Sequence, residues 1–396
     1  MVISLDLLQT VGLAVIVFYF GRWVKQQVRF FQTYFIPAPV IGGLIFSVLV
    51  LVAMKGFGVN VKMDATLQNF FMNLFFTCIG FTVSLKVIKQ SGKQGAILSV
   101  VAVALLVIQN GVGVALCDVF GINKLLGIAM GSISMSGGVG SGAAFGPTLE
   151  KLGADGATTI GVAAATFGLL MGSLIGGPVA KRLIDKHGLT SDYEHDDESL
   201  KEKKASAPFV ELTLLNAVLI VLLAAAGGTL ISALLKMTHL TFPYYVGCLF
   251  GGAVVRNIAD ARGVDLHMPE INAVGNITLN LFLSITLMRL NLAKLASLAG
   301  PMLVILLVQA AVMMVYAYFV TFRSMGKSYD AAVMAAGHCG VGLGQTPNAI
   351  ANMASVIERN GPAPNAWFVL PVITVVFINL LNPVIITLFI NLFSGG

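Results

Sequence analysis

The feature that most constrains the fold of this chain is a series of apolar segments, each long enough to cross a bilayer. A transmembrane helix needs about 20 largely apolar residues to cross roughly 30 Å of hydrocarbon. Only 11% of the 396 residues are charged, whereas a soluble domain carries about 25%. The sequence therefore predicts an all-α integral membrane protein with ten transmembrane helices, near residues 5–23, 36–54, 68–88, 95–117, 157–181, 209–235, 241–257, 271–290, 297–320 and 366–393.

Two further segments, 125–149 and 329–354, are too polar and too rich in glycine for ordinary spans. The first contains "SISMSGGVGSGAAFG" (132–146). Glycine weakens a helix by about 1 kcal/mol relative to alanine but lets the chain reverse direction. We expect each segment to form a re-entrant hairpin, because irregular backbone at membrane depth needs protein or water to satisfy it. The alternative is that these small residues only allow close helix packing.

The chain also repeats itself. "GVGSG" at 138–142 matches "GVGLG" at 340–344, and "NLFF" at 73–76 matches "NLFL" at 280–283. The prediction is of two repeats, residues 1–181 and 209–396, joined by a linker at 182–208. Each repeat has five spans and one hairpin. An odd number of spans inserts the second repeat upside down, and secondary transporters place their substrate between such inverted repeats.

The distribution of basic residues predicts the orientation in the membrane. With both termini outside, most of the 24 Lys and Arg residues fall on the cytoplasmic side, as the positive-inside rule requires. The mixed-charge linker 182–208 is then expected to be cytoplasmic, and the chain to be a multi-pass membrane protein.

The hairpins also provide the candidate site for an anion. Helix ends at a hairpin tip offer N–H groups with partial positive charge to an anion. The acidic residues avoid the interior of every predicted span and lie in loops, in the linker or at span ends, which makes an anionic substrate electrostatically tolerable and a cationic one unfavourable. The predicted substrate-binding residues are Ser136, Gly137, Gly138, Gly140, Ser141, Gly142, His338, Cys339, Gly340, Gly342, Gly344, Gln345 and Thr346.

Sodium is the expected coupling ion. A proton-coupled carrier usually buries an ionisable relay, and His338 is the only deep candidate; bracing of the second hairpin is an equal alternative for it. Neutral oxygens suit a hard cation. Candidate sodium ligands are Asn73, Thr77, Ser134, Asn276, Asn280, Ser284 and Asn348. Further candidate donors for the anion are polar residues within spans, among them Gln109, Asn110, Gln309, Asn379 and Asn382.

Other functions receive little support. The basic residues are scattered, which argues against a nucleic-acid partner. The four cysteines have unrelated spacings and no metal-binding or nucleophile motif is present, so we do not expect an enzyme.

The sequence resembles the bacterial sodium/glutamate symporters over nearly its whole length. The matching stretches are "IPAPVIGGL" (36–44), "GSISMSGGVGSGAAF" (131–145), "ATFGLLMGSLIGGPVA" (165–180) and "SYDAAVMAAGHCGVGLGQTPNAIANM" (328–353). The resemblance implies ten spans in two inverted halves, two re-entrant hairpins, a homodimer and sodium-driven uptake of glutamate. It also implies that Ser136–Gly142 and His338–Thr346 form the translocation site. The sequence departs from the family pattern at Val139, Ser141, Phe145 and Gln345, which leaves the substrate range open.

The leading hypothesis is thus sodium-coupled symport of L-glutamate by an elevator-like movement of a hairpin-bearing domain. One alternative is a proton- or sodium-coupled carrier of another organic anion, such as aspartate or a dicarboxylate. Another, from a different class, is an anion channel.

Overall fold

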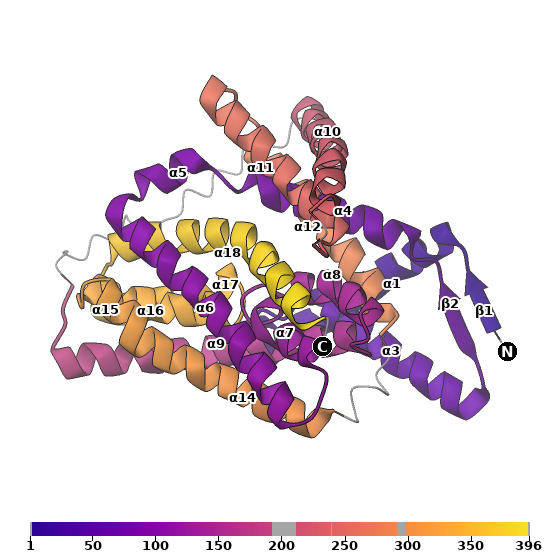
Figure 1. The fold of residues 1–396 in the computed structure, drawn as a ribbon, viewed down its shortest axis with the longest axis horizontal. Coiled ribbons are helices and arrows are strands. Elements are labelled where there is room, and N and C mark those ends of the chain that lie inside the picture. The colour runs from indigo at the N-terminus through magenta and orange to yellow at the C-terminus, as the bar shows by residue number, and fades with distance from the viewer. Residues whose placement is uncertain (1, 192–210, 239, 291–297, 395–396) are drawn as a thin grey trace.

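The computed structural model describes residues 2–191, 211–238, 240–290 and 298–394 (Figure 1). In the first half the elements are β1 (Val2–Leu5), α1 (Leu7–Gln27), α2 (Arg29–Thr33), α3 (Ala38–Phe57), β2 (Asn60–Met63), α4 (Thr66–Phe81), α5 (Leu85–Gln90), α6 (Gly92–Val119), α7 (Lys124–Ile128), the π-helical turn η1 (Ala129–Ile133), α8 (Gly138–Lys151) and α9 (Ala157–His187). In the second half they are α10 (Glu211–Lys236), α11 (Tyr244–Arg262), α12 (Met268–Met288), α14 (Ala299–Tyr316), the π-helical turn η2 (Ala317–Thr321), α15 (Phe322–Ser324), α16 (Tyr329–Gly342), α17 (Thr346–Asn360) and α18 (Pro364–Phe393).

The predicted spans appear as helices, with some changes at their ends. Within the described residues, eight helices are long and apolar enough to cross a membrane. The two other expected spans correspond to α11, which carries Arg256, Asp260 and Arg262 near its end, and to α18, of which Phe377–Phe393 is apolar.

One predicted boundary is wrong. The linker was expected to begin at 182, but α9 continues to His187 and ends at Gly188, which adopts a left-handed conformation. Lys186 and His187 in its last turn stabilise this helical extension through the helix dipole. Only residues 188–191 of the expected linker are described beyond the helix; 192–208 lie outside the described residues.

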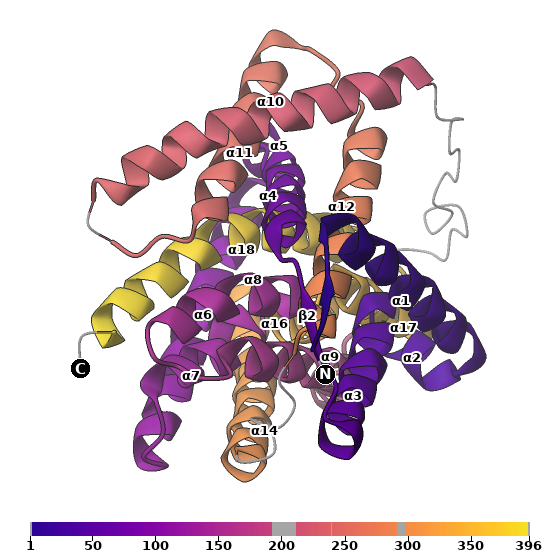
Figure 2. The same cartoon turned by 90° about the vertical axis from the view of Figure 1, so that its right-hand side faces the viewer.

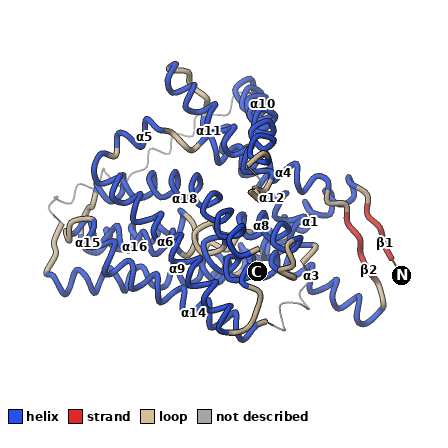
Figure 3. Tube along the Cα trace, viewed as in Figure 1, coloured by secondary structure: helices blue, strands red, loops and turns tan. Residues whose placement is uncertain are grey.

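A short sheet was also not predicted. β1 and β2 form a parallel pair, with Val2 opposite Asn60 and Leu5 opposite Met63. The two strands lie at one end of the molecule, beside α1 and α3 (Figures 1 and 3). Four-residue strands this short lack the periodic pattern that distinguishes a strand from a loop.

The helices form two layers, and each half of the chain contributes to both. Helices α1, α3, α4, α10, α11 and α12 pack on one another, and we call them the panel layer. Helices α6–α9 and α14–α18 pack on one another and form the hairpin layer. Figure 2 shows α10 lying across the top of α11 and α4, away from α14 and α16. The first three long helices of each half thus lie in the panel layer, and the rest of each half lies in the hairpin layer.

The starts and ends of α3 and α11 match in detail. Each helix follows a proline at its N-cap, Pro37 or Pro243, and each ends at a glycine in the left-handed conformation, Gly58 or Gly263. Proline favours a helix start and left-handed glycine a helix end. The correspondence extends the internal similarity seen in the sequence from the glycine motifs to a helix of the panel layer.

Candidate functional site

Helix α9 sets the positions of the two glycine-rich hairpins. Its 31 residues span about 46 Å at ~1.5 Å per residue. The first hairpin (α7, η1, α8 and the turn 134–137) has its base at the start of α9, where Glu150 accepts a bond from the Thr158 N–H at 3.1 Å. The second hairpin (α16, α17 and the turn 343–345) has its base at the other end, where Ser191 donates to the Pro362 carbonyl at 2.6 Å.

The tips of the two hairpins meet beside the middle of α9. Ser134 in the first tip donates to the Gly161 carbonyl at 2.7 Å, and Asn348 in the second donates to the Leu169 carbonyl at 2.7 Å. A side chain on Gly138 would come within 2.9 Å of the Gln345 amide nitrogen. The hairpins therefore approach from opposite ends of α9 and touch at their tips.

The backbone of the first tip is irregular. Gly131 leaves helical geometry at φ −90° and ψ −135° inside η1, and Gly138 at the start of α8 has φ +71°, which favours glycine because it lacks a Cβ. The second tip breaks more simply, since α16 ends at Gly342 and Gln345 is extended before α17 begins.

Buried amide side chains satisfy the broken backbone. Asn110 accepts from the Ser132 N–H at 2.8 Å, and Asn382 donates to the Ser132 carbonyl at 2.9 Å. Gln109 donates to the Gly342 carbonyl at 2.6 Å and accepts from the Ser136 hydroxyl at 2.7 Å, so it links the two tips. These bonds replace the water that is missing at membrane depth.

The same amides leave oxygen atoms without a partner. Gln309 donates to the Gln109 carbonyl at 2.7 Å, yet its own side-chain oxygen is buried and unpartnered, as are those of Asn348 and Asn382 and the hydroxyl of Ser132. A buried polar group left without a partner costs about 1–3 kcal/mol. Such oxygens fit a hard cation, which prefers neutral or anionic oxygen ligands.

A small cavity of about 60 Å³ lies between the hairpin tips and the panel layer. Its hairpin side is formed by Gly137, Gly140, Ser141 and Gln345, and its α18 side includes Asn379 and Asn382. The opposite wall is apolar and comes from α4, α11 and α12, through Phe75, Phe76, Ile79, Leu249 and Leu279. Pockets for drug-sized ligands have roughly 300–1,000 Å³, so a solute of amino-acid size requires the two layers to separate here.

Two helix N-termini border this cavity. Gly140 and Ser141 belong to the first turn of α8, and Gln345 is the N-cap of α17. Neither N-terminus has a hydrogen bond from a capping side chain. No charged residue lines the cavity. The arrangement offers partial positive charge from two directions to an anion.

The other predicted substrate residues lie in or behind the tips. Glycines 142, 340 and 344 are packing positions: Gly142 lies against Gly161, while Gly340 and Gly344 lie against the Asn348 region. A Cβ on Gly342 would meet Met313 at 2.6 Å, so this glycine faces α14 and not the cavity. Thr346 starts α17.

His338 and Cys339 are both buried in α16. The Nδ1 atom of His338 lies 2.8 Å from the Thr321 hydroxyl in η2, and its Nε2 has no partner. Neither residue lines the cavity between the layers. The contact with Thr321 corresponds to the bracing alternative for His338.

The predicted sodium ligands are divided among three places. Ser134 and Asn348 are buried in the hairpins. Asn73 and Thr77 are on α4, and Ser284 is buried on α12. On the same helix, Asn276 is exposed and its carbonyl accepts a bond from Asn280 at 2.8 Å. The structure therefore does not gather the seven residues into one site.

Sequence reasoning missed the apolar wall of the cavity. Phe75 and Phe76 belong to the repeated stretch "NLFF", but the repeat does not indicate that they face a cavity, and Leu279 looks like any lipid-facing or core residue. Asn382 was one of many polar residues in spans; its position directly before Pro383, which aligns with Pro178 in the repeat, was the available signal.

Comparisons with known proteins identify the family. Residues 3–362 match the family model described as "Sodium/glutamate symporter". The chain is 39% identical to a sodium/glutamate symporter from Escherichia coli, over 99% of each chain. It is 36% identical to a sodium/glutamate symporter from Haemophilus influenzae, over 94% of each chain. A solved sodium proton antiporter from Methanocaldococcus jannaschii matches with a TM-score of 0.41 and 14% identity, over 99% of this chain and 97% of that one.

Proposed function

Because this chain belongs to the sodium/glutamate symporter family, we propose that it carries L-glutamate across the bacterial inner membrane together with sodium, by alternating access. Sodium is the coupling ion of the family. The observation that carries the proposal is the pair of uncapped helix N-termini, of α8 and α17, at one uncharged cavity. Both carboxylates of glutamate can be met there without a basic side chain.

In this proposal the substrate binds between the two hairpin tips. Main-chain N–H groups at Gly140 and Ser141 face one carboxylate, and the start of α17 after Gln345 faces the other. The hydroxyl of Ser141 and the amides of Gln345 and Asn379 add donors. Charge-assisted hydrogen bonds of this kind are stronger than neutral ones.

Sodium is proposed to bind to oxygens of the hairpin layer. The unpartnered oxygens of Asn348, Asn382, Gln309 and Ser132 are the residues that fit it. The amide nitrogens of Asn382, Asn348 and Gln309 already donate to main-chain carbonyls. These carbonyls belong to Ser132 in the first hairpin, Leu169 on α9 and Gln109 on α6. A bound cation would therefore fix the tip geometry, which couples ion binding to substrate binding.

The topology proposed for the membrane is that of two inverted repeats with ten spans. Both termini are outside, the linker is cytoplasmic, and the hairpins enter from opposite faces. This is supported by the bases of the hairpins at opposite ends of α9 and by the matching ends of α3 and α11.

The movement proposed is a sliding of the hairpin layer along the panel layer, in a homodimer. It is supported by the apolar wall of Phe75, Leu249 and Leu279, whose side chains cannot form hydrogen bonds to the hairpins and therefore offer little resistance to sliding. Such an elevator-like step would expose the cavity to each side in turn.

The test is uptake of labelled L-glutamate by purified protein in liposomes. An inward sodium gradient should drive accumulation, and removal of sodium should abolish it. Equal uptake under a proton gradient without sodium would overturn the ion assignment. A flux far above carrier rates, without accumulation against a gradient, would indicate the anion channel.

A smaller or different dicarboxylate remains the second candidate for the cargo. The observation in its favour is the cavity volume of about 60 Å³. Competition by L-aspartate and by non-amino dicarboxylates in the same uptake assay distinguishes these substrates.

A further inference from the structure

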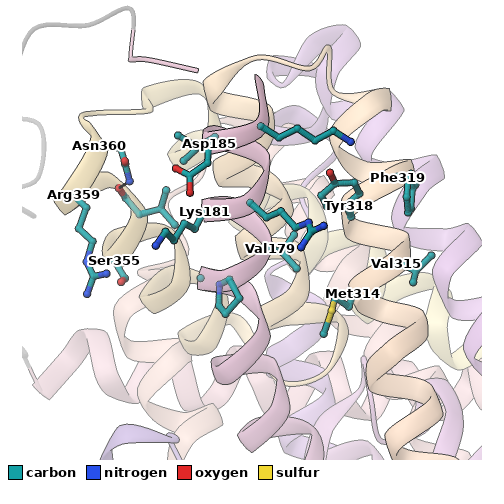
Figure 4. A pocket seen from close by; sticks show the side chains of 16 residues that line it. Val179, Lys181, Asp185, Met314, Val315, Tyr318, Phe319, Ser355, Arg359 and Asn360 are labelled. Atoms are coloured by element: carbon teal, nitrogen blue, oxygen red, sulfur yellow. Dashed lines mark hydrogen bonds between the residues drawn. The ribbon is translucent and has the colours of Figure 1, made fainter. Parts of the chain in front are cut away.

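A groove of about 1320 Å³ lies away from the hairpin tips. It runs across the C-terminal part of α9, between α14–η2 on one side and the end of α17 on the other (Figure 4). Nothing in the proposed transport cycle uses it. The groove belongs to the hairpin layer alone, since α9, α14 and α17 all lie in that layer.

The polar end of the groove is strongly basic. Lys181, Arg182 and Lys186 come from α9 and Arg359 from α17, against the single carboxylate of Asp185. All four basic residues are exposed, and none forms an ion pair with a carboxylate in the part of the chain that the structure describes. Figure 4 shows Lys181 between Arg359 on one wall and Tyr318 on the other. The site therefore has an excess of uncompensated positive charge.

The other end of the groove is apolar and open. Met314, Val315 and Phe319 on α14 and η2 are exposed by 42%, 56% and 46%, and all three line the groove. Val179 on α9 faces the same space. Exposed apolar side chains of this kind inside a membrane-spanning helix are suited to hydrocarbon.

The change from apolar to basic occurs in the same direction on each wall. On α9, Val179 is followed by Lys181 and Lys186; on α14 and η2, Val315 is followed by Tyr318, whose ring lies 5.7 Å from Lys186 Nζ. Aromatic and basic residues gather at the boundary between hydrocarbon and headgroups. Helix dipoles explain why basic residues are favourable at helix C-termini, but they do not explain the exposed apolar wall beneath them.

From this geometry we propose that the groove binds one anionic phospholipid of the bilayer. Its phosphodiester lies among Arg182, Lys186, Lys181 and Arg359, and an acyl chain lies against Val315 and Phe319. Basic pockets between transmembrane helices bind anionic headgroups in this way. Because α9, α14 and α17 all border the groove, the lipid is carried by the hairpin layer.

The test is lipid retention, measured by native mass spectrometry on the full-length protein. The protein is offered phosphatidylglycerol and phosphatidylcholine with identical acyl chains. We expect selective retention of phosphatidylglycerol. Each basic residue removed should lower the affinity roughly fivefold, so Arg182→Gln with Lys186→Gln should lower it more than tenfold.

The matched control is Lys89→Gln with Arg262→Gln, which removes two exposed basic residues outside the groove and should leave retention unchanged. If the first pair does not fold, Lys181→Gln with Arg359→Gln tests the same groove. Equal retention of both lipids, or unchanged retention in the groove variants, would overturn the proposal. Displacement of phosphatidylglycerol by inorganic phosphate would show that the groove binds free anions and not a lipid. None of these readouts depends on transport.

Discussion

The two hairpins carry almost the same glycine motif, yet their backbones are satisfied in different ways. The first hairpin breaks twice, at Gly131 and before Gly138, and depends on Asn110 and Asn382 from other helices. The second consists of two regular helices that break once and bring their own amides, Asn348 and Asn352, to the carbonyls of α9. Both hairpins receive an amide from outside, since Gln109 of α6 donates to the Gly342 carbonyl, but only the second brings amide side chains of its own to α9.

Their glycines differ in the same sense. Gly140 in the first hairpin faces the cavity, with Phe75 the nearest atom to a Cβ at 3.4 Å, while its counterpart Gly342 in the second faces Met313 at 2.6 Å. The same motif thus lines the cavity in one hairpin and makes a packing contact in the other. Each variant below is chosen to test this difference.

The largest effect is expected for Asn382→Leu. The change removes the amide bond to the Ser132 carbonyl, which keeps only the Gly137 N–H at 2.9 Å, and it removes a polar group from the cavity. We expect sodium-driven glutamate uptake to fall at least a hundredfold, because the first hairpin loses an external support and the site loses an oxygen. Uptake in liposomes checks this. Wild-type uptake kinetics in this variant would contradict the proposed dependence of the first hairpin on Asn382.

A smaller effect on transport is expected for Asn352→Leu in the second hairpin. This side chain donates to Gly172 and Ala336 carbonyls at 2.9 and 3.1 Å and does not line the cavity. Loss of both bonds should reduce the free energy of unfolding by about 1–3 kcal/mol. The KM for glutamate should stay within twofold. Thermal unfolding in detergent measures the stability, and uptake kinetics measure the KM. A large rise in KM would show that the second hairpin affects glutamate binding as much as the first, which would contradict the proposed difference.

The glycine pair provides a third test. Gly140→Ala places a methyl group in the cavity at van der Waals distance, so it should raise the KM several-fold with little loss of stability. Gly342→Ala forces Met313 to move and should instead lower stability by about 1–3 kcal/mol. Gly111→Ala, where nothing lies within 4 Å, is the control: it should leave the KM unchanged and, as a glycine-to-alanine change inside a helix, raise stability by at most about 1 kcal/mol. If Gly140→Ala lowered only the stability and Gly342→Ala raised only the KM, the proposed roles of the two glycines would be wrong.

The smallest effect is expected outside both hairpins, at the connection from α4 to α5. The carboxylate of Asp260 accepts one hydrogen bond from the Ser84 hydroxyl and another from Arg256 Nε, the latter at 3.0 Å. Burial opposes ionisation there, but the bonds from Ser84 and Arg256 outweigh it and lower the pKa of Asp260. Asp260→Asn should cost at most about 1–2 kcal/mol.

The pH dependence of this contribution follows from the direction of the shift. A carboxyl with a lowered pKa stabilises the fold above its unfolded pKa of about 4, and this contribution is lost as the pH falls through the folded value. Unfolding temperatures of wild type and Asp260→Asn should therefore converge below about pH 4. A constant difference at all pH values would contradict the assignment.

The sequence predicted the helical segments well because apolar runs and glycine clusters have strong local signals. It located the glycine-broken helix pairs at 124–151 and 329–360, where re-entrant hairpins at 125–149 and 329–354 were expected; their re-entry into the membrane stays a prediction. Gly137, Gly140, Ser141 and Gln345 line the cavity between the layers, and their role in substrate binding stays a prediction too. The sequence did not predict the two strands, the extension of α9 to His187 or the apolar wall of Phe75 and Leu249. Those features depend on which helix packs against which, and a single apolar residue carries no information about its partner.

The central claim is that two hairpins enter from opposite faces and meet at their tips. Its most direct test is labelling of Lys151→Cys and Arg359→Cys, at the ends of the first and second hairpins. Each is placed in a variant lacking Cys78, Cys117, Cys248 and Cys339 and exposed to a membrane-impermeant maleimide in right-side-out and inverted vesicles. The account predicts that position 151 reacts only from outside and position 359 only from inside. Reaction of both positions from the same face would contradict it.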